Sequence, residues 1–247
     1  SAAPVKNEGS AIAYDNAQEA FTARYNHETI ALGFSLTEEA VEDNLYASLS
    51  SRYTKALARA MAYTKQTKAA AVLNNGFSAN YPGGDGVALF HATHANLAGA
   101  GTVIDVASLT AGRTAMRKQK GLQSEELNLA PAYLIVPAAI EGVAYQYTSG
   151  NYVPATAANV NEFRAGGRTA IEPVVEALLD GSSATAWYLA ANTGAVDTVE
   201  YCFLDGAEGP VIESEVGFEV DGISYKCRED FAAKAIDYRG LYKNAGA

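Results

Sequence analysis

The sequence predicts an α+β protein, built as one large domain or as two intertwined ones. Three observations lead to this fold class. Apolar residues repeat with helical spacing over residues 45–75, apolar and polar residues alternate over residues 21–34, and an Asp-Gly pair lies between two alternating runs in residues 215–228. A chain of 247 residues can bury a sizeable core without disulfides or a structural metal.

The composition is that of a globular protein. Apolar residues make up 49% and charged residues 19% of the chain. Apolar runs such as AYLIVPAAI at 132–140 are too short to span a bilayer, and no secretory signal is visible, so we expect no membrane partner. Cys202 and Cys227 lack the close spacing of a metal or redox motif, and we expect two buried free thiols, with a disulfide as the alternative.

Charge is distributed unevenly along the chain, whose net charge is −10. Residues 1–50 carry eight acids and two bases, whereas residues 51–84 carry five bases and no acid. Such an acidic chain repels phosphate and is a poor non-specific binder of nucleic acid. The basic block allows three interpretations, namely a solvated helix face, a surface facing DNA, or a surface facing a neighbour's acidic arm. Its residues are Arg52, Lys55, Arg59, Lys65 and Lys68.

Residues 10–35 are expected to form an extended hairpin arm. The apolar positions change parity along it, from Phe21, Ala23, Tyr25 and His27 to Ile30, Leu32 and Phe34. Because strand side chains alternate between faces, the buried face changes sides along this arm. We infer that two different bodies cover the arm and that its tip lies on another subunit. A bulge within one sheet is the alternative.

Two helices should follow the arm. Thr37 and the acids after it predict a short helix over 37–43. The stripe over 45–75 predicts a helix about 45 Å long that Gly76 can end. Further along the chain, Ser108 is expected to cap a helix that ends near Gly121, and another short helix should end near Thr148.

Strands are expected near 132–137, 169–175, 185–190 and 198–204, with an irregular loop over 150–168. At the Asp221-Gly222 turn, a two-residue hairpin would pair Val220 with Ile223, Phe218 with Tyr225 and Val216 with Cys227 on one face. Glu219 would pair with Ser224 and Glu215 with Arg228 on the other.

The segment HATH places His91 and His94 three residues apart. Two imidazoles at this spacing can share a metal, but a catalytic zinc normally needs a third protein ligand. HExxH, CxxC and GxSxG motifs are all absent from the sequence. We therefore expect a hydrogen-bonded loop pair, no metal, no cofactor and no enzyme, with a metal-dependent hydrolase using both histidines as the alternative.

Several long motifs resemble the major capsid proteins of tailed bacteriophages, in the subgroup often encoded with a prohead protease segment. They are GDGVALFHATHANLAGAGTVIDVASLTAGRTAMRKQKG at 84–121, LNLAPAYLIVPAAIE at 127–141, SSATAWYLAA at 182–191, VDTVEYCFLDGAEGP at 196–210 and DYRGLYKN at 237–244. A weaker match covers 25–44. The resemblance is collinear over nearly the whole chain.

The resemblance implies the Hong Kong 97-type capsid fold. In this fold we assign residues 1–9 to the remnant of an N-terminal arm and 10–35 to the extended hairpin loop. The peripheral domain takes 36–100 and 205–247, with a spine helix at about 45–75. The axial domain takes 101–204, and its 150–168 loop is the candidate for contacts around the hexamer and pentamer axes.

The implied function is structural. Copies of the chain would assemble as hexamers and pentamers into the icosahedral head that encloses double-stranded DNA without sequence-specific binding. The implied partners are the chain itself, a scaffold, a maturation protease, the portal and decoration proteins. Assembly would occur in the cytoplasm of the host bacterium. A cellular nanocompartment shell, as in encapsulins, and a phage tail or decoration protein are the structural alternatives.

The residues expected at the assembly interface are Phe21, Arg24, Tyr25, Arg52, Lys55 and Arg59. We expect the acidic N-terminal region to lie near a neighbour's basic block. Some relatives crosslink through a lysine in the extended loop. Lys6 is the only lysine before Lys55 and lies away from the expected tip near 15–20, so we expect no such crosslink.

Overall fold

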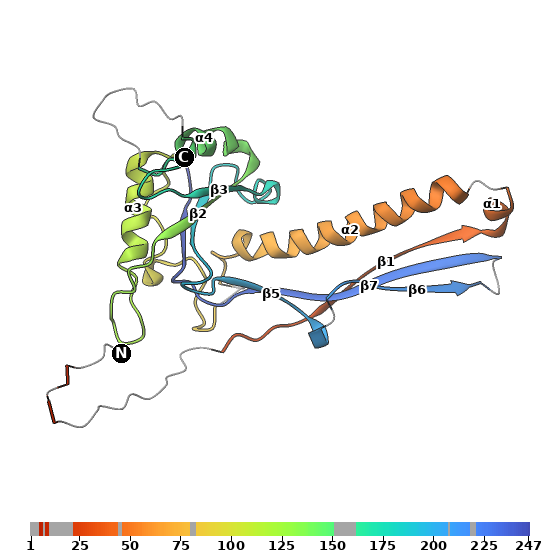
Figure 1. The fold of residues 1–247 in the computed structure, drawn as a ribbon, viewed down its shortest axis with the longest axis horizontal. Coiled ribbons are helices and arrows are strands. Elements are labelled where there is room, and N and C mark those ends of the chain that lie inside the picture. The colour runs from red at the N-terminus through yellow and green to blue at the C-terminus, as the bar shows by residue number, and fades with distance from the viewer. Residues whose placement is uncertain are drawn as a thin grey trace. The chain divides into compact units, whose positions relative to one another are not determined.

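The computed structural model describes residues 5–6, 8–9, 22–43, 46–79, 83–150, 162–206, 208–217 and 221–247 (Figure 1). Helices and strands are mixed along the chain, which confirms the α+β class. The chain divides into two compact units. The first unit comprises Ser1–Ala23, Leu73–Val199 and Ala235–Ala247, and the second comprises Arg24–Val72 and Glu200–Lys234.

The boundaries of these two units differ from those of the expected peripheral and axial domains. The second unit begins before residue 36 and takes in residues 200–203 of the strand at 199–203, whereas residues 73–100 and 235–247 group with the first unit. The physical reason is that the segments after the long helix and after the last long strand pair with residues of the first unit. The Ile236 amide donates to the Thr198 carbonyl (2.8 Å), and the Lys243 amide donates to the Asn96 carbonyl (2.8 Å).

A four-stranded sheet forms the centre of the first unit. Its strands are β2 (Pro131–Val136), β3 (Glu172–Val175), β4 (Trp187–Ala191) and β8 (Leu241–Asn244), in the order β3-β2-β4-β8. β2 pairs parallel with β3 and antiparallel with β4, which pairs antiparallel with β8. Three of these strands were predicted from their apolar runs, and every residue of β4 is buried.

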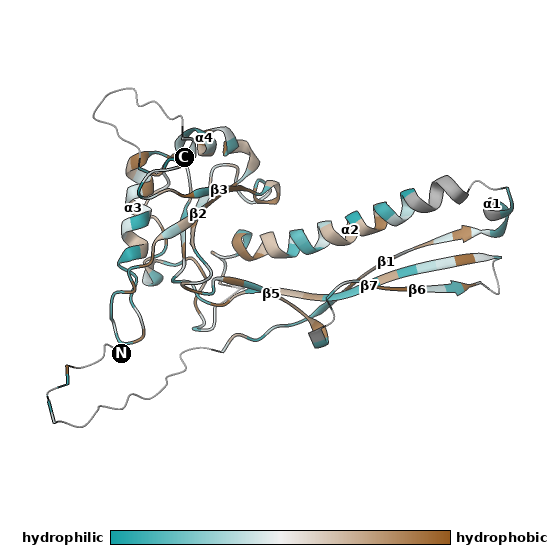
Figure 2. Cartoon of the chain, viewed as in Figure 1, coloured by the Kyte–Doolittle hydropathy of each residue, from teal (hydrophilic) through white to brown (hydrophobic). Residues whose placement is uncertain are grey.

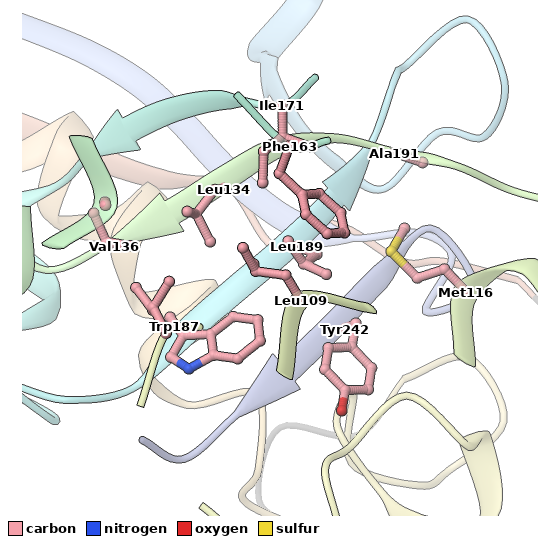
Figure 3. Packing of buried hydrophobic residues seen from close by; sticks show 12 residues of the cluster. Leu109, Met116, Leu134, Val136, Phe163, Ile171, Trp187, Leu189, Ala191 and Tyr242 are labelled. Atoms are coloured by element: carbon pink, nitrogen blue, oxygen red, sulfur yellow. The ribbon is translucent and has the colours of Figure 1, made fainter. Parts of the chain in front are cut away.

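The helices α3 (Val106–Arg117) and α4 (Glu141–Thr148) contribute to one core with this sheet. Figure 3 shows Leu109 and Met116 of α3 gathered with Trp187, Leu189 and Tyr242. Trp187 is fully buried, and its indole Nε1 donates to the Thr102 carbonyl at 3.0 Å. The helix comes close to the sheet at Gly112, where an added Cβ would lie 2.7 Å from Leu189 Cδ1.

The predicted cap of α3 needs a correction. Asp105 is the N-cap, and its Oδ1 accepts from the Ser108 amide at 2.6 Å. Ser108 instead occupies the third helical position, where its Oγ accepts from the Asp105 amide at 3.0 Å. Both donors are thus satisfied in a reciprocal capping box. The helix ends at Arg117, before Gly121.

A second sheet forms the base of the second unit. Its strands are β1 (Glu28–Thr37), β5 (Val199–Phe203), β6 (Val211–Val216) and β7 (Gly222–Ala235). β7 lies between β1 and β5, and β6 also pairs with β7. β1 is antiparallel to β7 over its whole length, from Glu28 opposite Phe231 to Thr37 opposite Gly222. Residues 28–35 therefore pair with β7 rather than with an earlier arm segment, while residues 10–21 of the expected arm lie outside the described residues.

The predicted register of the hairpin at 215–228 was wrong by four residues. Ile223 pairs with Val216 rather than Val220, Tyr225 pairs with Ser214, and Cys227 pairs with Ile212. Glu215 lies opposite Ser224, and Val211 lies opposite Arg228. The start of β7 also contacts the end of β1, because the Glu38 amide donates to the Asp221 carbonyl (3.2 Å). An even shift keeps the same side chains on the same face, so the alternation could not reveal the error. Phe218, Glu219 and Val220 lie outside the described residues.

Two helices follow β1, as predicted. They are α1 (Glu38–Glu42) and α2 (Tyr46–Asn74). In Figure 1, α2 runs alongside β1 and β7. Leu57 and Met61 of α2 pack on Ile30, Cys227 and Phe231 of those strands. Hydrophilic and paler stretches alternate along α2 in Figure 2, as expected for a helix with one apolar face.

The change of parity predicted for the N-terminal region is present. Ala23, Tyr25 and His27 are partly buried at alternate positions, after which Ile30, Phe34 and Leu36 are the more buried set. Leu32, which was predicted to belong to this second set, is instead 47% exposed. Residues of this same chain cover both sets. Tyr25 Oη donates to Glu200 of β5 at 2.5 Å, whereas Phe34 stacks between Tyr53 of α2 and Tyr225 of β7 with ring centroids 5.6 and 5.2 Å away.

Two lysines of the basic block hold α2 to the sheet. Lys65 Nζ lies 3.0 Å from Glu229 Oε1, and the Glu229 side chain is 1% exposed. Its other oxygen, Oε2, is buried and has no hydrogen-bond partner among the described residues. Lys68 pairs with Glu28, whose side chain is 68% exposed. A buried carboxylate without its counter-ion is costly, while an exposed ion pair contributes little. Lys65 is therefore the ion-pair partner on which α2 depends.

We predict that Lys65→Met lowers the free energy of unfolding of the isolated subunit by about 3 kcal/mol, because Glu229 would stay buried and unpaired. Lys68→Met is the matched control and should cost under about 1 kcal/mol. Adding Glu229→Leu to Lys65→Met should recover most of the loss. Urea unfolding measures all three variants, and equal effects of the two lysine substitutions would contradict this account.

Candidate assembly surface

The outward face of α2 carries three cations without an ion-pair partner. Arg52, Lys55 and Arg59 lie three and four residues apart, which places them on one side of the helix. All three are exposed, and none of them forms a salt bridge with another described residue. Tyr63 continues this side with a ring that is 59% exposed. We call Arg52, Lys55 and Arg59 the basic face. Lys65 and Lys68 do not belong to it, because they point to the sheet.

The N-terminal interface candidates are placed differently. Arg24 is exposed, and its carbonyl accepts from Lys234 Nζ at 3.2 Å. Tyr25 is partly buried against Glu200, and burial together with this hydrogen bond raises the pKa of its phenol. Phe21 lies outside the described residues. Arg24 and Tyr25 therefore contact β7 and β5, whereas Arg52, Lys55 and Arg59 lie on the outward side of α2.

Strand β6 exposes apolar side chains that the sequence analysis did not single out. Val216 is 75% exposed and Ile212 is 63% exposed, and both lie on the face of the sheet that α2 covers at Cys227. Glu213 and Glu215 occupy the other face, where Lys226 and Arg228 pair with Glu213. Exposed apolar positions on an edge strand are typical of contact surfaces, and the acids disfavour pairing of two such edges. The wrong register hid this pattern by assigning Val216 to the position opposite Cys227.

The two cysteines are free thiols, as predicted, but only Cys227 is buried, whereas Cys202 is partly exposed. Cys227 is buried in the core below α2, and Cys202 Sγ lies 3.7 Å from His27 Nε2. Burial raises the pKa of both thiols, which disfavours the reactive thiolate. Among the described residues, no helix is long and apolar enough to cross a membrane.

His91 and His94 are held by separate partners in the loop after α2. His91 is the N-cap of a short 3-10 turn over Ala92–His94, where its Nδ1 accepts from the Thr93 amide at 3.3 Å. His94 is buried, stacks on Tyr238 with ring centroids 3.7 Å apart, and lies 2.6 Å from Asp85 through its Nε2. The described residues contain no group of three potential ligands that could hold a metal ion. The loop-pair interpretation of this motif is the one that the contacts favour.

Both ring nitrogens of His94 face acceptors. Nδ1 lies 3.1 Å from the Leu89 carbonyl, and Nε2 faces the Asp85 carboxylate. For Asp85, burial opposes ionisation, but hydrogen bonds from the Val87 amide (3.0 Å) and from His94 outweigh it and hold the pKa of this carboxyl below its usual range.

This cluster clasps the loop at 83–94 to the segment that follows β7. Gln119 Nε2 donates to the His94 carbonyl at 2.9 Å. The Cζ atom of Arg239 lies 5.3 Å from the centroid of the Tyr238 ring, on which His94 stacks. A cavity of about 180 Å³ lies beside the clasp, and Asp85, His94, Asp237, Tyr238 and Arg239 line it. Sequence spacing could not predict these contacts, because Tyr238 and His94 are far apart in the chain.

Lys243, near the C-terminal end of the chain, is a buried cation with aromatic rings around it. Lys243 of β8 is 9% exposed, and its Nζ lies 4.4 Å from the Phe77 ring, 5.8 Å from Phe90 and 5.7 Å from Tyr188. Aromatic faces attract an ammonium group, most strongly where water is excluded. Burial lowers the pKa of this lysine. The cage fixes β8 beside the loop that carries the histidines.

Comparisons with known proteins agree with the resemblance. A family model described as phage capsid protein matches residues 19–244. No curated protein matches the chain.

Solved structures share the fold at low identity. The capsid of cyanophage P-SCSP1u is 13% identical, with a TM-score of 0.57 over 100% of this chain and 80% of that chain. A structure from Mycobacterium phage Che8 is 12% identical, with a TM-score of 0.54 over 89% and 72%. The SrpI encapsulin complex of Synechococcus elongatus PCC 7942 is 10% identical, with a TM-score of 0.53 over 89% and 73%. These likenesses show the fold, which phage and encapsulin shells have in common.

We predict that Asp85→Asn lowers the free energy of unfolding by about 1.5–3 kcal/mol at pH 7, the range for a hydrogen bond to a charged group. Because the folded pKa of Asp85 is depressed, its contribution is present above the unfolded pKa of about 3.9 and is lost as pH falls through the folded pKa. The difference between variant and wild type should therefore shrink in acid. Urea unfolding between pH 7 and pH 2 measures it, with Glu126→Gln at an exposed ion pair as the control. A difference that stays constant over this range would contradict the assignment.

Proposed function

Because the chain belongs to the phage capsid protein family, we propose that it is the major capsid protein of a tailed bacteriophage. It is accordingly a structural protein of a capsid shell. In the proposal, copies assemble as hexamers and pentamers into an icosahedral head that encloses double-stranded DNA. The observation that carries it is the family match over residues 19–244, supported by a fold that the phage capsid structures have in common with this chain.

We assign domain roles to the parts that both the expectation and the compact units group together. Residues 101–199 act as the axial domain, and residues 36–72 and 205–234 act as the peripheral domain with α2 as its spine. The 150–168 loop remains our candidate for the axial contact, although residues 151–161 lie outside the described residues. The exposed apolar residues of β6 and the basic face of α2 support a role for the peripheral domain in contacts between copies.

The charge of the subunit suits a container for DNA. A net charge of −10 repels phosphate, so a lining made of this chain would not hold packaged DNA tightly or read its sequence. Scaffold, maturation protease, portal and decoration proteins are the further partners in this proposal, and assembly takes place in the cytoplasm of the host bacterium.

A nanocompartment shell is the second candidate function, because an encapsulin complex has the same fold at a TM-score of 0.53. The two candidates differ in what the shell holds. Fold alone does not decide between them, since one fold can serve different contents. The nucleic-acid content of purified particles separates them.

We predict that native particles of this protein are closed angular shells filled with double-stranded DNA. Negative-stain electron microscopy, combined with nuclease-protected nucleic-acid content, tests this directly. Closed shells that hold protein cargo and no DNA would contradict the phage proposal and favour the nanocompartment. Tubes or isolated trimers would contradict both and indicate a tail or decoration protein.

A further inference from the structure

The basic face of α2 has the features of a docking surface. Its three cations extend over eight residues, or about 10 Å of helix, and no described residue of the same chain neutralises them. The exposed ring of Tyr63 lies one turn further along the same side. Resting on the proposed function, we infer that this face binds the acidic corner of a second copy of the chain in the assembled shell.

The acidic corner consists of α1 and the turn beside it. Glu38, Glu39 and Glu42 of α1 are exposed, as are Asp43 and Asp221. The hydrogen bond from the Glu38 amide to the Asp221 carbonyl holds the two parts together. No lysine or arginine occurs in residues 28–43 or 208–225, so the corner contains five acids and no base.

Ion pairs within the chain reduce the number of cations and acids that are available for a contact between copies. Of the five bases in the block, Lys65 and Lys68 are already paired with Glu229 and Glu28. Because Glu28 pairs with Lys68, it is not one of the unpaired acids of the N-terminal region. Within the basic block, the cations left without an ion pair among the described residues are Arg52, Lys55 and Arg59, and the acids of the corner likewise form none. Within the described chain they form no ion pair with each other.

The dimensions of the two surfaces agree. α1 has five residues and is about 7.5 Å long, close to the length of the basic face. A contact between a corner and a helix face uses two different surfaces, so it is heterologous and can be repeated from copy to copy. Each exposed ion pair contributes only about 0.2–1 kcal/mol. The contact therefore gives orientation and partner choice, while apolar surfaces such as that of β6 add affinity.

Packaged DNA is the competing partner for a row of cations. A helix face that contacts DNA has no need of a complementary surface on the same protein, whereas here the complement is present and unpaired. The two partners predict different effects of charge reversal. Loss of a contact between copies prevents shells from forming, while loss of a DNA contact leaves shells intact and changes their DNA content.

The test is a charge swap in the full-length chain. Variant one carries Arg52→Glu, Lys55→Glu and Arg59→Glu, and variant two carries Glu38→Lys, Glu39→Lys and Glu42→Lys. Variant three combines all six substitutions. The matched control keeps the charge, with Arg52→Lys, Lys55→Arg and Arg59→Lys. Shell yield is measured by sedimentation and electron microscopy, and circular dichroism with thermal unfolding confirms that each subunit is folded.

We expect variants one and two each to lose at least tenfold in shell yield, whereas variant three and the control assemble like the wild type. Normal shells from variant one, with normal or altered DNA content, would overturn the inference. So would a folded variant three that fails to recover assembly. These outcomes concern variants of a wild type that forms shells, so they leave the capsid proposal standing. That proposal fails only on the wild-type particles themselves.

Discussion

The burial of Glu229 beneath α2 determines which side of this helix faces away from the sheet. A carboxylate that is 1% exposed needs its counter-ion, and Lys65 supplies it from α2 at 3.0 Å. Together with Leu57 and Met61, this pair allows only one side of the helix to face the sheet. Arg52, Lys55 and Arg59 must therefore face outward. The buried ion pair between Lys65 and Glu229 therefore determines which side of α2 is available to a partner.

Local patterns predicted most elements and few of their long-range relations. The apolar stripe of α2, the buried run of β4 and the parity change before Ile30 are properties of short segments, and all three are present. The register between β6 and β7 does not follow from alternation, because an even shift keeps the same side chains on the same face. The partner of Lys65 is 164 residues away in the chain. Spacing therefore identified a basic block, and only the fold separated its inward lysines from its outward cations.

The histidine motif illustrates the same limit. Sequence spacing suggested a shared metal or a loop pair, and the contacts of His94 with Asp85 and Tyr238 favour the loop pair. These contacts fasten the loop after α2 to the segment after β7. Such a clasp gives the motif a structural role, in which His94 is buried and His91 caps the 3-10 turn. The fold itself is common to phage and encapsulin shells, so the contents of the shell depend on surfaces rather than on the core.

A cryo-electron microscopy map of the assembled shell, at a resolution that shows side chains, tests the central claim most directly. The account predicts that α1 of a neighbouring copy lies against the basic face, with carboxylate oxygens within about 4 Å of the cationic nitrogens. A shell in which Arg52, Lys55 and Arg59 face open solvent or the enclosed DNA would contradict it.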